Sequence, residues 1–198
     1  MQNRTKTSII LVFGIIALLG IVPSFFAAFP MKSSSGGGPD FYVISREVSL
    51  NEMIEKGNEY NLSIYLPAEI PDNLELTAIY LRNWSFLAIV VYSAEGNKDY
   101  KTAEFVIQIT PTSDTPTYEE ISAEAGNSAD VLALEINGWP TIIYERASSG
   151  GNIETRDKWG NWLLLVRLWI EGIRYNLVAP TLCTDDVIEV IENMSSFL

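Results

Sequence analysis

Residues 162–179 read WLLLVRLWIEGIRYNLVA, and this stretch decides the fold because it predicts a β-hairpin. Its branched and aromatic residues favour strands, and Glu171-Gly172 in the middle is typical of a two-residue hairpin turn. The first half, 162–170, is apolar on both of the faces that an alternating strand presents. A strand of this kind is covered on both sides, so we expect 162–170 to lie in the centre of a sheet.

Arg167 is the one charge within that first half, and it interrupts an otherwise apolar face. A buried guanidinium is unfavourable unless it finds a partner. We therefore expect Arg167 to form a structural ion pair, with contact to a ligand carboxylate as the alternative.

The chain before this hairpin predicts further strands and a second tight turn. The stretch INGWP at 136–140 contains Asn137-Gly138, a pair that tolerates the positive φ angles of a type I′ turn. Along 104–110, apolar residues alternate with mostly polar ones, so we expect one face of that strand to be buried and the other to be wetter. Strands are expected at 74–81, 86–92, 104–110, 131–136 and 140–146.

Three short helices are predicted by their starting residues. Ser49 with Glu52 and Thr117 with Glu120 have the spacing of a capping box, and acidic residues follow Thr184 at the start of a third helix. The pattern predicts an α+β domain at 41–198. We expect a curved antiparallel sheet of hairpins, half-barrel-like, with two or three short helices packed on one face.

The first forty residues differ from the rest of the chain. From Ser8 to Ala28 the sequence is apolar and uncharged, long enough for a transmembrane helix at 8–29 that serves as a signal anchor. A cleaved signal peptide is the alternative. The basic residues before the segment predict a cytoplasmic N-terminus at 1–7, and a Ser/Gly linker at 30–40 would hold the domain outside the cell membrane.

Composition excludes several classes of function. From Asp40 onward the chain carries 10 basic and 25 acidic residues, a net charge of −15, which disfavours binding to nucleic acid. There is no histidine, and Cys183 is the only cysteine, so catalysis and metal sites that depend on these residues are excluded. We expect no cofactor, no metal and no catalytic residue.

The order of these features resembles a group of membrane-anchored extracytoplasmic domains of bacteria and archaea that are classed as domains of unknown function. The resemblance rests on LSIYLPAEIPDNLELTAIY at 62–80, EFVIQIT at 104–110, INGWPTIIYE at 136–145 and LLLVRLWIEGIRYNLVA at 163–179. More distantly, the layout looks like lipoprotein-carrier and periplasmic stress-sensor folds. That likeness implies a half-barrel with an apolar interior and no catalytic centre.

Three hypotheses of function follow. The first is an extracytoplasmic binding or sensing domain, which is no enzyme and recognises a ligand or an envelope protein. The second is a carrier of a lipid or other apolar ligand between sheet and helices, for which Arg167 could provide a polar contact. Its apolar lining would come from Phe105, Tyr144, Trp162 and Trp169. The third is a hydrolase that depends on aspartate and glutamate.

Overall fold

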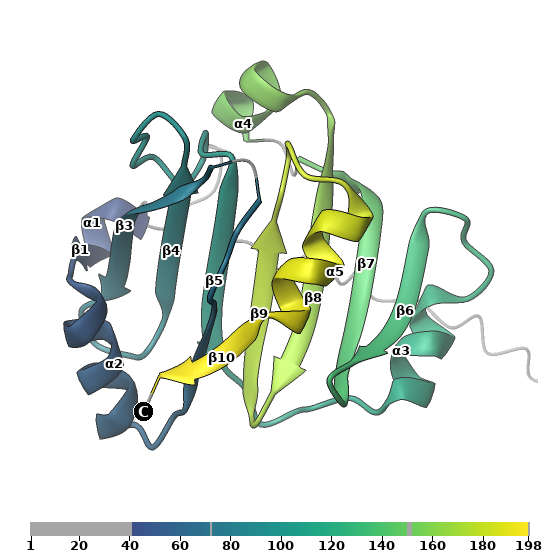
Figure 1. Ribbon diagram of the computed structural model, residues 1–198, viewed down its shortest axis with the longest axis horizontal. Coiled ribbons are helices and arrows are strands. Elements are labelled where there is room, and N and C mark those ends of the chain that lie inside the picture. The colour runs from purple at the N-terminus through teal and green to yellow at the C-terminus, as the bar shows by residue number, and fades with distance from the viewer. Residues whose placement is uncertain (1–40, 72, 150–151, 198) are drawn as a thin grey trace, which may run out of the picture.

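One large antiparallel sheet organises the chain, whose computed structural model describes residues 41–71, 73–149 and 152–197 (Figure 1). Within these residues, eight strands pair in the order β1-β3-β4-β5-β9-β8-β7-β6, and β10 pairs with β2 in a small second sheet. The strands are β1 (Ser45–Glu47), β2 (Ile64–Pro67), β3 (Glu75–Arg82), β4 (Ala88–Ser93), β5 (Phe105–Pro111), β6 (Val131–Ile136), β7 (Trp139–Ser148), β8 (Trp162–Ile170), β9 (Ile173–Val178) and β10 (Met194–Phe197). The helices are α1 (Phe41–Ile44), α2 (Leu50–Glu59), α3 (Tyr118–Ala125), α4 (Ile153–Trp159) and α5 (Thr184–Glu192).

The hairpin predicted at 162–179 is the centre of the large sheet. Strand β8 pairs with β7 on one side and with β9 on the other, and β9 continues the sheet to β5. The turn between them has φ angles of 48° at Glu171 and 77° at Gly172. Asn137 and Gly138, at 54° and 79°, form the equivalent turn between β6 and β7. Both hairpin predictions are confirmed.

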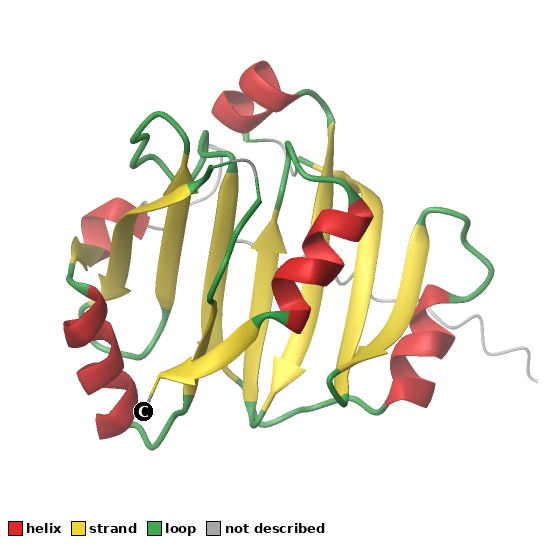
Figure 2. Cartoon of the chain, viewed as in Figure 1, coloured by secondary structure: helices red, strands yellow, loops and turns green. Residues whose placement is uncertain are grey.

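One face of the sheet, which we call the α5 face, carries the main hydrophobic core. Helix α5 lies across β8 and β9 on this face, beside the small β2–β10 sheet (Figures 1 and 2). Val187, Val190 and Ile191 of α5 pack in the same buried cluster as Ile107 and Leu177 of the sheet. The hydroxyl of Tyr175 accepts a hydrogen bond from the backbone N–H of Tyr65 at 3.0 Å, which ties the small sheet to the large one.

The opposite face, which we call the α3 face, carries two smaller apolar clusters. The Val106 cluster includes Phe41 of α1 and has Trp159 of α4 packed against it. The Trp169 cluster brings Ile121 of α3 against the sheet. The prediction of helices on one face only is therefore wrong, because the larger sheet has two apolar faces and each is covered by helices.

The prediction of a wetter face on the strand at 104–110 holds only at the ends of that strand, where Glu104 and Thr110 are half-buried. Val106 and Gln108 lie on the α3 face of β5, and both are buried. The polar side chain at 108 suggested contact with water, whereas Gln108 is only 3% exposed.

The predicted helix starts are confirmed at all three positions. Ser49 and Thr117 accept hydrogen bonds from the backbone N–H groups of Glu52 and Glu120, at 3.2 and 3.3 Å. At the start of α5 the carboxylate of Asp186 accepts from the backbone N–H of Cys183 at 2.9 Å. Hydrogen bonds from Cys183, first from its side chain and then from its backbone N–H, lower the pKa of Asp186.

The transmembrane helix predicted at 8–29 and the linker predicted at 30–40 fall outside the described residues. Among the residues that are described, no helix is both long and apolar enough to cross a membrane.

The hydrogen bond at Tyr175 gives a test of how the two sheets are held together. Tyr175→Phe leaves the part-buried N–H of Tyr65 without its acceptor, which costs about 1–3 kcal/mol. We expect the free energy of unfolding, measured by urea denaturation of the full chain, to fall by that amount.

Tyr92→Phe is the matched control, because Tyr92 is also buried on the α5 face and no hydrogen bond of its hydroxyl is seen within the described residues. The Tyr92 variant should lose clearly less stability than the Tyr175 variant. Equal losses would contradict the role given to the Tyr175 hydroxyl.

Candidate functional site

A group of polar side chains lies in the middle of the α3 face, between the Val106 cluster and the Trp169 cluster. We call it the Asn176 patch. Its five members come from the three central strands: Gln108 and Thr110 of β5, Arg174 and Asn176 of β9, and Arg167 of β8.

Strand pairing places these side chains next to one another. Gln108 is opposite Asn176, and Asn176 is opposite Arg167, so the three form one row across the sheet. In the next row Thr110 is opposite Arg174. Side chains opposite one another on the same face have Cβ atoms about 4.5–5.5 Å apart, and diagonal neighbours such as Arg167 and Arg174 are about 7–8 Å apart.

The patch is bounded by apolar residues on two sides. Val106 and Val178 form the adjacent row and belong to the cluster that α1 and α4 cover. Ile142 is paired with Arg167 across β7 and β8, and it belongs with Trp169 to the cluster under α3. The polar side chains therefore occupy the gap between two apolar regions.

Buried polar atoms without hydrogen-bond partners are concentrated in this patch. In the described part of the chain, nine buried side-chain nitrogen or oxygen atoms have no partner, and six of them are here. These six are Gln108 Oε1, Thr110 Oγ1, Asn176 Oδ1, Asn176 Nδ2, Arg167 Nε and Arg174 Nε. Asn176 is 0% exposed and Gln108 is 3% exposed. Because most buried polar groups in proteins are hydrogen-bonded, six such atoms in one place are unusual and make this patch the candidate site.

Arg174 carries an uncompensated positive charge. Among the described residues, no carboxylate lies within ion-pair distance of it and no aromatic ring stacks on it. Arg82 and Arg146, which also lack ion pairs there, lie over the rings of Trp84 and Trp162. Burial and the nearby Arg167 guanidinium both lower the pKa of Arg174. An anion placed beside the two arginines would relieve both effects.

Arg167 is held from the other side by α3. Its Nη1 lies 3.7 Å from Glu124 Oε1 and 3.4 Å from the Tyr144 hydroxyl, and its guanidinium lies over the Tyr144 ring. Tyr144 donates a hydrogen bond to Glu124 at 2.6 Å; burial and this bond raise the pKa of Tyr144. The ion pair predicted for Arg167 is present, but it is long, and Arg167 Nε has no partner.

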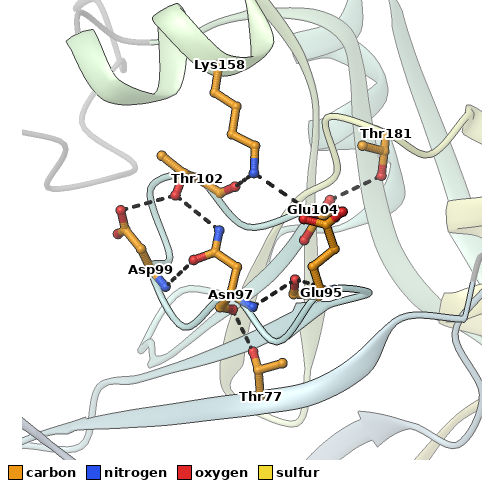
Figure 3. A network of polar contacts seen from close by, with 9 residues as sticks. Thr77, Glu95, Asn97, Asp99, Thr102, Glu104, Lys158 and Thr181 are labelled. Atoms are coloured by element: carbon orange, nitrogen blue, oxygen red, sulfur yellow. Dashed lines mark hydrogen bonds and ion pairs between the residues drawn. The ribbon is translucent and has the colours of Figure 1, made fainter.

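The loop between β4 and β5 shows, by contrast, how a polar network in this fold is satisfied (Figure 3). The Asn97 amide accepts from the N–H of Asp99 and donates to the Thr102 hydroxyl, which donates to the Asp99 carboxylate. Lys158 of α4 donates to the Thr102 carbonyl at 2.7 Å. These contacts anchor α4 and the loop at the edge of the Val106 cluster, and they explain the polar residues there as structural.

The residues predicted to line an apolar ligand site do not come together. Phe105 is buried in the main core on the α5 face. Trp169 and Tyr144 belong to the cluster on the α3 face, and Trp162 is 55% exposed beside Arg146. Arg167, the residue predicted to provide a polar contact to a ligand, belongs to the Asn176 patch.

Four residues of the patch were not predicted as site residues. The sequence pattern predicts Gln108 and Thr110 on the wetter face of a strand, and Arg174 and Asn176 within a hairpin. A signal was present: Arg174 and Asn176 are the polar residues of IRYNLV, two positions apart, and so share one face. Only the pairing of β9 with β5 and β8 brings them beside Gln108 and Arg167.

In the described ranges, no three acidic or cysteine side chains are grouped as metal ligands would be. Comparison with known proteins adds no relative: no family model, no curated protein and no solved structure matches this chain.

The unpaired atoms of Asn176 give a prediction about stability. Asn176→Leu removes two buried polar atoms that have no partner, so we expect the free energy of unfolding of the ligand-free chain to rise by about 1 kcal/mol. Gln108→Met should also raise the free energy of unfolding, and it changes the shape of the side chain less than Asn176→Leu does. Urea denaturation followed by tryptophan fluorescence measures both.

Ser93→Ala is the control with the opposite sign. Ser93 is 1% exposed, but its hydroxyl accepts from the N–H groups of Glu95 and Asn97, so its loss should destabilise by about 1–3 kcal/mol. If Asn176→Leu and Gln108→Met both destabilise as Ser93→Ala does, Asn176 and Gln108 are satisfied within the fold and the patch is structural.

Proposed function

We propose that this chain is an extracytoplasmic binding domain, anchored to the cell membrane through residues 8–29, and that the Asn176 patch is its ligand site. The observation that carries the proposal is the concentration of six unpaired buried polar atoms on three adjacent strands. A ligand that hydrogen-bonds to them would remove a penalty of about 1–3 kcal/mol for each group.

The location of the patch supports a binding role. It lies on the central strands, where the backbone is held by pairing on both sides, so its side chains are preorganised. The apolar clusters on either side would exclude water from a bound ligand and strengthen its polar contacts. The proposal also includes the resemblance to extracytoplasmic domains and, more distantly, to carrier and stress-sensor folds. That resemblance implies that the sheet forms a curved half-barrel.

A thermal unfolding screen of the full chain tests this function. The chain is heated in the presence of a panel of small polar molecules that includes acids, amides, sugars and amines. A ligand that binds only the folded state at about 100 times its Kd stabilises by about 2.7 kcal/mol, which raises the Tm by several degrees. We expect at least one member of the panel to do so.

Two variants locate the effect. Asn176→Leu should abolish the rise in Tm, whereas Asn58→Leu, the same substitution at an exposed position of α2, should retain it. A stabilising compound that acts equally on the Asn176 variant, or a panel without any effect on the wild-type chain, would contradict the proposal.

A further inference from the structure

We infer that the ligand of the Asn176 patch is a small carboxylate that carries a hydrogen-bond donor, an N–H or O–H, beside the acid group. This inference rests on the proposed function and identifies the chemical class of the ligand. It follows from the charge of the patch and from the balance of its unpaired donors and acceptors.

The charge of the patch requires an anion. Arg174 and Arg167 lie on adjacent strands on one face, and Arg174 makes no ion pair within the described residues. The domain has 25 acidic residues from Asp40 onward, yet none of the described ones neutralises Arg174. The Arg167 guanidinium is close enough to lower the pKa of Arg174, and an oxyanion between the two groups would accept charge-assisted hydrogen bonds from both.

The unpaired atoms require more than an anion. Arg167 Nε, Arg174 Nε and Asn176 Nδ2 are donors, which suit the oxygens of a carboxylate. Gln108 Oε1 and Asn176 Oδ1 are acceptors, and a carboxylate has no proton to give them. The ligand must therefore carry an N–H or O–H close to its acid group, as an N-acylated amino acid does.

The charge of the patch favours a carboxylate over a phosphate. A phosphate ester carries a charge of about −1.5 to −2 at neutral pH, whereas a carboxylate carries −1. The patch offers one uncompensated cation, because Arg167 is partly neutralised by Glu124 at 3.7 Å, and the domain around it is acidic. A single negative charge matches this site, and a doubly charged ligand would be repelled by the surrounding carboxylates.

The acid group could come from a free small molecule or from the C-terminus of a peptide, since both have a carboxylate beside an amide N–H. Titration calorimetry of the full chain distinguishes these sources with N-acetylglycine and N-acetyl-pentaglycine as probes. Three comparison ligands each lack one feature of N-acetylglycine. Acetamide lacks the charge, acetate lacks the N–H donor, and inorganic phosphate lacks the planar, singly charged acid group. We expect N-acetylglycine to bind more tightly than any of these three.

Substitution of the cation identifies the site. Arg174→Met should weaken N-acetylglycine binding by roughly tenfold or more, the loss expected for a charge-assisted hydrogen bond. Arg174→Lys should recover part of the affinity, because it restores the charge without the planar fork. Arg146→Met is the matched control, since it removes one exposed arginine elsewhere and should leave the affinity unchanged.

The possible results test the ligand class separately from the site. Binding of N-acetyl-pentaglycine at equal or greater affinity assigns the acid to a peptide C-terminus, and much weaker binding assigns it to a free acid. Phosphate or acetamide binding more tightly than N-acetylglycine overturns the inference. A third result would separate the two claims: a neutral ligand binds, Arg174→Met leaves its affinity unchanged, and Asn176→Leu abolishes its binding. In that case the carboxylate inference fails and the proposed function stands. If none of the probes binds the wild-type chain, the inference fails, and the thermal screen then decides the proposed function separately.

Discussion

The structure depends on the burial of β9 on both faces. This strand is hydrogen-bonded to β5 and β8, and its residues alternate between two very different environments. Ile173, Tyr175 and Leu177 face the main core, while Arg174, Asn176 and Val178 face the other side. Strand pairing fixes this register, because a shift by one residue would place Arg174 and Asn176 in the apolar core. The Asn176 patch is therefore a consequence of the pairing that holds the sheet together.

Polar side chains in this protein occur in two kinds of environment, one with hydrogen-bond partners and one without. In the loop between β4 and β5, Asn97, Asp99 and Thr102 satisfy one another, and Lys158 closes the network from α4. In the centre of the sheet, Asn176 and Gln108 are more deeply buried than these half-buried loop residues, yet both amide atoms of Asn176 and Oε1 of Gln108 have no partner among the described residues. An unpaired group of this kind lowers stability, so each one calls for an explanation, and functional sites are where proteins most often keep such exceptions. This contrast within one chain is the physical basis of the proposed site.

Local sequence signals predicted much of the fold. Capping residues and the two-residue turns at Asn137-Gly138 and Glu171-Gly172 were read correctly because each depends on only a few neighbouring residues. The placement of helices on both faces could not be read this way, since it depends on which strands become neighbours. Helix α4 and the short strands β1, β2 and β10 were missed for a related reason, as their contacts are mostly with distant segments.

The site was predictable only in part. Arg167 was recognised because it interrupts an apolar strand, and it does lie in the patch. Gln108 and Asn176 each look ordinary in their own strand, and they become a site only through the β5–β9 register. The aromatic residues predicted to line an apolar ligand site have a suitable side-chain type, but strand alternation places Phe105 and Trp169 on opposite faces of the sheet.

The most direct measurement of the central claim is NMR of the side-chain amide groups in the full chain during titration with N-acetylglycine. If the patch binds this ligand, the NH₂ resonances of Asn176 and Gln108 shift together and saturate, while those of Asn97, whose amide is already paired, stay in place. Unchanged Asn176 and Gln108 resonances at a ligand concentration that saturates the calorimetric binding would contradict the account and place the ligand elsewhere.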